Sequence, residues 1–118
     1  LKIAIIGLGY VGLPLALAFE KKRSVIGFDI EKKRIEELLS GIDKNLESTK
    51  DELQNTKKLN FTSNEADLKL ANCYIITVPT PINESKEPDL NPLFRASKTV
   101  GKFLKKGDLI IYDCGSSI

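Results

Sequence analysis

Residues 2–12 read Lys2-Ile3-Ala4-Ile5-Ile6-Gly7-Leu8-Gly9-Tyr10-Val11-Gly12, a nearly unbroken apolar run that leads directly into a glycine-rich turn. Residues 2–6 do not alternate between apolar and polar, which is typical of a strand covered by helices on both faces, and so of a parallel sheet. Residues 10–22 then place apolar side chains at helical spacing and end in charged residues. The order of strand, glycine turn and helix is the start of a βαβ unit.

The rest of the chain continues to alternate between apolar runs and amphipathic segments. Gly41 is a suitable stop for the second helix, and Asn91 is a suitable N-cap for the last one, with Pro92 at its first position. The alternation predicts an α/β fold, a Rossmann-like doubly wound parallel sheet in three αβα layers with strand order 3-2-1-4-5. The predicted elements are a strand at Ser24–Phe28, a helix at Glu31–Ser40 with Ile35, Leu38 and Leu39 inward, a short helix near Lys50–Thr56, strands at Asn60–Thr62 and Cys73–Val78 separated by a polar turn, a helix with a stripe through Leu93, Ala96, Val100, Phe103 and Leu104, and a strand at Leu109–Tyr112.

Each glycine of the turn has its own predicted role. Gly7 permits the tight turn, Gly9 lets the backbone approach a pyrophosphate, and Gly12 lets the helix pack closely against the strand. The free amides at the start of the helix, in a turn that includes Tyr10 and Val11, then face two phosphates. The pattern predicts a dinucleotide site at the carboxyl ends of the strands.

Asp29 supports this prediction because it follows the second strand, 22 residues after Gly7, where a carboxylate can bind a ribose diol. An alternative is that Asp29 only caps the helix near Glu31, although capping and ribose binding are compatible. A carboxylate facing a 2′-phosphate would cost on the order of a few kcal/mol, which favours NAD over NADP. The basic residues 32–34, which end in Arg34, could instead hold the 2′-phosphate of NADP, so NADP stays an alternative. If they form a solvated helix face, they do not contact the cofactor.

A second segment of the predicted site is the loop Thr77-Val78-Pro79-Thr80-Pro81, which leaves the fourth strand at its carboxyl end. The prolines stiffen a loop that presents hydroxyl groups towards the cofactor, and Thr80 is the hydroxyl we expect there. The alternative is an ordinary loop that ends a strand.

The composition argues against several other classes of protein. Basic residues number 18 and acidic residues 16, in scattered clusters rather than the stripe that nucleic-acid binding needs. The chain has no histidine, and its two cysteines, Cys73 and Cys114, lack metal-ligand spacing, which predicts no metal site and a reducing, cytoplasmic setting. Residues 3–19 could pass for a signal peptide or membrane span, but glycines and Pro14 interrupt them. Cys73, inside an apolar strand, is expected to be an inert core residue.

Several motifs together resemble the amino-terminal domain of the UDP-glucose/GDP-mannose dehydrogenase family, and most closely its bacterial branch that acts on UDP-N-acetylhexosamines. The similarity extends over almost the whole chain. The residues that carry it are Gly7-Leu8-Gly9-Tyr10-Val11-Gly12-Leu13-Pro14-Leu15-Ala16, Thr77-Val78-Pro79-Thr80-Pro81-Ile82, Pro88-Asp89-Leu90 and Gly107-Asp108.

The resemblance implies a cytoplasmic enzyme that oxidises the C6 hydroxyl of a UDP-sugar to a carboxylate with two NAD⁺, for surface polysaccharide synthesis. It implies that Val11, Asp29, Arg34 and Thr80 contact NAD, and that the full-length protein is a homodimer with no membrane or nucleic-acid partner. The catalytic cysteine and its partners are expected beyond Ile118. Residues 1–118 would then be a NAD-binding domain that lacks the central helix and the C-terminal sugar-nucleotide domain.

The end of the chain departs from the family pattern, because Gly115 stands where the family has a threonine expected at the cofactor. Two other functions stay open on the sequence alone. One is a regulatory module that senses NAD without a catalytic partner. The other is a different Rossmann dehydrogenase, although this segment lacks the histidine base that many hydroxy-acid dehydrogenases use.

Overall fold

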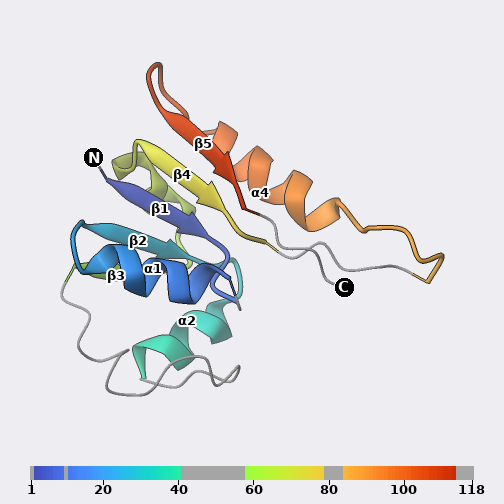
Figure 1. The fold of residues 1–118 in the computed structure, drawn as a ribbon, viewed down its shortest axis with the longest axis horizontal. Coiled ribbons are helices and arrows are strands. Elements are labelled where there is room, and N and C mark those ends of the chain that lie inside the picture. The colour runs from blue at the N-terminus through green and yellow to red at the C-terminus, as the bar shows by residue number, and fades with distance from the viewer. Residues whose placement is uncertain (1, 10, 41–57, 79–83, 114–118) are drawn as a thin grey trace.

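The parallel sheet predicted from the sequence is present in the computed structural model, which describes residues 2–9, 11–40, 58–78 and 84–113. Its strands lie in the order β3-β2-β1-β4-β5, and each neighbouring pair is parallel (Figure 1). The predicted order 3-2-1-4-5 is confirmed. The elements are β1 (Ile3–Ile6), α1 (Gly12–Glu20), β2 (Val25–Phe28), α2 (Lys32–Leu39), β3 (Leu59–Thr62), the 3₁₀ helix η1 (Glu65–Leu70), β4 (Cys73–Ile76), α4 (Asn91–Gly101) and β5 (Leu109–Tyr112).

Side chains that alternate along β1 enter two separate cores. Ile3 and Ile5 join one cluster, to which α1 and α2 also contribute. Ala4 and Ile6 join another, to which η1 and α4 contribute. All four residues of β1 are buried, because helices cover both faces of the sheet at its centre. The three predicted layers are therefore present (Figure 1).

The first two helices are shorter than predicted. Residues 21 and 22 form a turn after α1, and α2 ends at Leu39 rather than Ser40. Leu38 is buried as expected, but Leu39 was wrongly placed inward, since 65% of its surface is exposed. Adjacent helical residues are about 100° apart, and α2 packs through Ile35 and Leu38, which leaves Leu39, its last residue, at the solvent-facing edge. Gly41 and the predicted helix at 50–56 lie outside the described residues.

The predicted polar turn after β3 is instead η1. The side chain of Asn64 caps it by accepting a hydrogen bond from the Ala66 N–H at 3.1 Å. Leu68 is completely buried, and the hydroxyl of Tyr74 in β4 donates to the Leu68 carbonyl at 2.8 Å. A contact between η1 and β4 thus stabilises a short helix in which half of the residues are charged.

The bounds of β4 and α4 also differ in detail from the predictions. β4 ends at Ile76, so Val78 lies beyond it. The N-cap position of α4 is Leu90 rather than Asn91, which makes Pro92 the second helical residue. The carboxylate of Asp89 accepts the Asn91 N–H at 3.0 Å, which caps the helix from one residue further back. Of the predicted stripe, Ala96 and Val100 are buried, Leu93 and Phe103 pack against the core, and Leu104 is 44% exposed.

Two further expectations concern the thiol of Cys73 and membrane-spanning helices. Cys73 is a buried free thiol, and burial raises its pKa, which disfavours the reactive thiolate. Within the described ranges, no helix is long and apolar enough to cross a membrane.

Candidate cofactor site

The predicted site residues come together at one edge of the sheet because three neighbouring strands end there. Gly7 follows β1, Asp29 follows β2 and Thr77 follows β4, with β1 lying between the other two strands. The carboxyl ends of parallel strands share an edge, so these residues meet although they are up to 70 positions apart (Figure 1).

The glycine turn adopts a conformation that requires glycine at two positions. Gly7 has φ +99°, in the region that residues with a side chain rarely adopt. A Cβ at Gly12 would overlap the carbonyl oxygen of Gly7 and lie 2.5 Å from Oγ1 of Thr77. Close packing at Gly12 was expected against the strand, and the structure identifies the turn itself and Thr77 as the neighbours. Among the described residues, and apart from its chain neighbours, no atom lies within 4 Å of the position that a Cβ at Gly9 would take, so this side of the turn is open there.

The helix after the turn offers backbone N–H groups to an anion. Val11 occupies the N-cap position of α1, and no side chain caps the helix there. The N–H of Leu13 already donates to the carbonyl of Gly9 at 3.2 Å. The N–H groups of the first helical turn otherwise need partners from outside the helix, and they carry the positive end of its dipole.

Asp29 uses its two carboxylate oxygens on two different segments. Oδ2 accepts a hydrogen bond from the Leu8 N–H at 3.0 Å, within the glycine turn. Oδ1 accepts one from the Glu31 N–H at 3.0 Å, at the start of α2. The capping alternative is therefore present, together with a direct tie to the turn. A carboxylate has about four acceptor positions, so further donors such as ribose hydroxyls can still bind it.

Arg34 lies against the turn rather than on a solvated face. Its Nε–H donates to the Leu8 carbonyl at 2.8 Å, and its side chain is only 13% exposed. Nη1 is 3.9 Å from a carboxylate oxygen of Glu37. Lys32 and Lys33 are exposed, so the basic run divides between one residue held on the turn and two in solvent.

Thr77 is buried, and its hydroxyl faces the turn. Oγ1 donates to the Gly7 carbonyl at 2.7 Å, and the Ile6 carbonyl lies 3.1 Å from it. Val78 is partly buried against the core on the α4 face. Sequence reasoning grouped both residues with the cofactor, but did not anticipate the hydroxyl's contact with the turn. It also missed Leu8, whose backbone N–H and carbonyl both bind side chains; no feature of the sequence marks that role.

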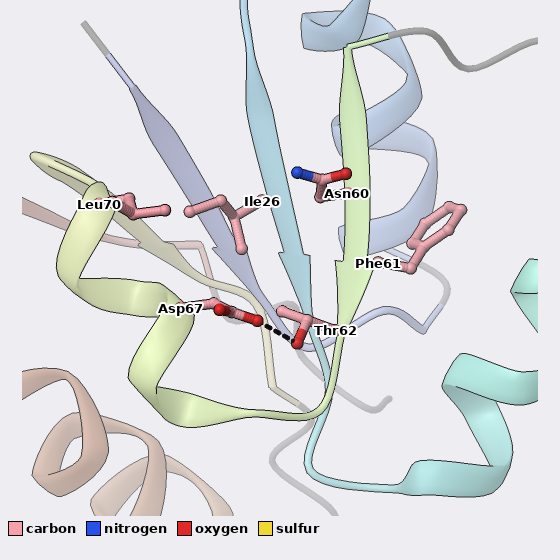
Figure 2. A pocket seen from close by; sticks show the side chains of 6 residues that line it. All are labelled: Ile26, Asn60, Phe61, Thr62, Asp67 and Leu70. Carbon is pink, nitrogen blue, oxygen red and sulfur yellow. Dashed lines mark hydrogen bonds between the residues drawn. The ribbon is translucent and has the colours of Figure 1, made fainter.

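The remaining predicted residues Tyr10, Pro79 and Thr80 lie outside the described part of the chain, as do Cys114 and Gly115. Elsewhere, a groove of about 280 Å³ lies beside β3, at the edge of the sheet that η1 adjoins (Figure 2). In it, the Thr62 hydroxyl donates to the Asp67 carboxylate at 2.6 Å. None of the predicted cofactor-site residues that the structure describes lines this groove.

Comparison with known proteins identifies the family. The model of the UDP-glucose/GDP-mannose dehydrogenase family, NAD binding domain, matches residues 1–117. The chain belongs to this family. The resemblance inferred from the sequence motifs is thereby confirmed, and NAD is the cofactor of the domain.

Members of this family supply close relatives of the chain. The UDP-N-acetyl-D-glucosamine 6-dehydrogenase of Salmonella typhi is 60% identical over 112 residues, which are 95% of this chain and 26% of that protein. The enzyme of the same name from Pseudomonas aeruginosa is 58% identical over 96% of this chain and 27% of that protein. A solved UDP-D-ManNAc dehydrogenase from Pyrococcus horikoshii superposes with a TM-score of 0.90 at 36% identity, covering 97% of this chain and 28% of that one. The chain spans about a quarter of the length of these dehydrogenases.

Proposed function

We propose that the chain is the NAD-binding part of a nucleotide-sugar 6-dehydrogenase, which oxidises the C6 hydroxyl of a UDP-hexose or UDP-N-acetylhexosamine to a carboxylate. The observation that carries the proposal is the glycine turn joined to Asp29 at the carboxyl ends of the central strands, in a chain of this family. The names of the two bacterial relatives favour UDP-N-acetylglucosamine as the substrate.

The reaction fixes what this domain has to do. Oxidation of an alcohol to a carboxylate removes two hydrides from C6, and each reduces one NAD⁺, with water supplying the second carboxylate oxygen. Residues 1–118 are proposed to bind the cofactor, within a longer chain that also has a central helix and a C-terminal domain for the sugar nucleotide. The catalytic groups are proposed to lie beyond Ile118, and the full-length protein to be a cytoplasmic homodimer in surface polysaccharide synthesis.

Within the domain, each part of the site has a proposed contact. The amides of Val11 and Gly12 face the pyrophosphate, because they lie at the start of α1 beside the open side of the turn. Asp29 accepts hydrogen bonds from the ribose diol. The other residues proposed near NAD are Gly7, Gly9, Tyr10, Arg34, Thr77, Val78, Pro79 and Thr80.

The activity is tested with the full-length protein and UDP-N-acetylglucosamine. We expect two NADH for each sugar oxidised, measured by absorbance, and a uronate product identified by mass spectrometry. UDP-glucose and UDP-N-acetylgalactosamine are compared at equal concentration to define the substrate. A yield of one NADH per sugar, or no oxidation of any UDP-hexose, would contradict the proposal.

The cofactor contact is tested by Asp29→Ala, measured by calorimetric titration of NAD. Hydrogen bonds to a charged group contribute about 1.5–3 kcal/mol, so we expect affinity to fall by about tenfold or more. Asp89→Ala is the matched control, because Asp89 caps α4 through the same two-residue spacing and the same 3.0 Å distance. Equal losses in the two variants, or tighter binding of NADP than NAD by the unmodified protein, would contradict the assignment.

A further inference from the structure

Two consecutive peptide groups of the glycine turn are held by three side chains, one following β4, one following β2 and one in α2. The Gly7–Leu8 peptide accepts the Thr77 hydroxyl through its carbonyl and donates its N–H to Asp29. The next peptide, Leu8–Gly9, accepts the Arg34 guanidinium through the Leu8 carbonyl. The carbonyl and N–H of a trans peptide point in opposite directions, so Thr77 and Asp29 hold the first peptide from opposite sides.

The Thr77 hydroxyl is not needed to pair the strands at this point. The backbone N–H of Thr77 already donates to the Ile6 carbonyl at 2.8 Å, which extends the ladder between β1 and β4. The hydroxyl adds a bond to the Gly7 carbonyl, at a residue that lacks a Cβ and whose backbone is therefore less restricted than that of other residues. Its distinct effect is therefore on the orientation of the Gly7–Leu8 peptide.

That orientation matters for an anion. The Gly7 carbonyl oxygen points towards Gly12 and the buried Thr77 hydroxyl, whereas the side of the turn at Gly9 is open. A carbonyl oxygen carries partial negative charge, so a Gly7 carbonyl rotated towards the open side would repel a phosphate there. When the Gly7 carbonyl stays inward, the backbone N–H groups at the start of α1 face the ligand.

We propose that Thr77 is a positioning residue for the cofactor, whose hydroxyl holds the glycine turn in the form that binds phosphate. This inference rests on the proposed NAD contacts of the turn and adds how the turn is kept ready before the ligand arrives. If only a fraction of molecules has the binding-competent turn, the apparent affinity falls to that fraction of the intrinsic affinity. Thr77 acts through Gly7 and need not touch the cofactor itself.

The test compares Thr77→Val, which keeps the shape but removes the hydroxyl, with Thr77→Ser, which keeps the hydroxyl. In the full-length protein we expect NAD affinity to fall about three- to tenfold in Thr77→Val, the range of one hydrogen bond. Thr77→Ser should bind within about twofold of the unmodified protein. The Leu8 amide, on the far side of the same peptide, should exchange its hydrogen faster in Thr77→Val and at the original rate in Thr77→Ser.

Tyr74→Phe is the control for a general loss of stability. It also removes a buried hydroxyl near two carbonyls, those of Leu68 and Ala71, but these lie in and after η1, away from the turn. We expect a lower melting temperature with unchanged NAD affinity. If Thr77→Val does not fold, Thr77→Ala removes the same hydroxyl without placing a methyl group against Gly12.

The outcomes separate the two proposals. Absence of NAD binding by the unmodified protein would overturn the proposed function. Normal binding by the unmodified protein together with undiminished affinity in Thr77→Val, or in Thr77→Ala, would overturn the positioning role alone. Failure of Thr77→Ser to restore affinity would also overturn it, because the methyl group rather than the hydroxyl would then matter.

Discussion

β4 and β5 are neighbouring parallel strands of similar sequence, Cys-Tyr-Ile-Ile and Leu-Ile-Ile-Tyr, with Ile75 paired to Ile111. All four residues of β4 are buried, whereas none in β5 is. β4 lies inside the sheet with packed clusters on both faces, whereas β5 is an edge strand among the described residues. An apolar run therefore predicts a strand, but the neighbours in the fold decide how much of it is buried.

The two strands also differ in what lies near them. β4 leads directly into Thr77, which contacts the glycine turn at Gly7 and Gly12. β5 follows α4, and in the described part of the chain no atom beyond the neighbouring residues and backbone of α4 lies within 4 Å of the position that a Cβ at its last residue, Gly101, would take. Changes where the turn meets Thr77 should therefore alter both stability and cofactor binding, whereas a change at Gly101 should alter neither strongly.

The largest effect is expected at Gly12, and the same substitution at Gly101, which is also in a helix, is the comparison. Gly12→Ala forces a methyl group into the Gly7 carbonyl and the Thr77 hydroxyl, so we expect a loss of about 3 kcal/mol or more in unfolding free energy, and no measurable NAD binding. Gly101→Ala should be neutral or stabilise α4 by up to about 1 kcal/mol, since alanine favours helix. Urea unfolding measures both, and similar losses in the two variants would remove the distinction.

An intermediate effect is expected at the paired isoleucines. Ile75→Val deletes one methylene from a side chain that is 5% exposed, which should cost about 1 kcal/mol in unfolding free energy. Ile111→Val makes the same deletion at a side chain that is 41% exposed, and should cost less than half as much. Valine keeps the β-branched shape, so strand propensity is matched. A cost at Ile111 equal to that at Ile75 would mean that β5 is buried in solution.

The sequence contained enough information to predict the sheet, because its central strands are unbroken apolar runs joined by segments of helical period. It was insufficient for η1, where a single buried residue, Leu68, gives no periodicity. The Tyr74 hydroxyl that binds the Leu68 carbonyl belongs to the following strand. The sequence pattern also led to a wrong prediction for Leu39, since a pair of adjacent leucines does not reveal which one faces the core.

At the site, the sequence identified residue types better than side-chain directions. The glycine spacing and Asp29 marked the turn and its carboxylate, and the structure brings them together at 3.0 Å. Arg34 and Thr77 were expected to face a ligand or solvent, yet both donate to carbonyls of the turn. Those directions depend on which strands and helices become neighbours, a property of the whole fold rather than of a local motif.

The smallest effect under ordinary conditions concerns alkaline pH and the buried phenol of β4. Burial raises the pKa of Tyr74 from its usual 10.0; the Lys105 charge opposes this shift and the Asp108 charge adds to it. The unfolded chain then loses this proton at lower pH than the folded chain, so ionisation stabilises the unfolded state as pH rises above about 10. Titration of the Tyr74 phenol should leave stability unchanged near neutral pH and lower it in the alkaline range. Burial likewise raises the pKa of Cys73 above 9.0, which adds a loss of the same sign.

Tyr74→Phe should therefore unfold more easily at neutral pH but lose less of its stability between neutral and alkaline pH, measured by urea unfolding at a series of pH values. Parallel pH profiles for the variant and the unmodified protein would show that the phenol is already solvated in the folded state, which would remove the contrast in burial between β4 and β5 at this residue.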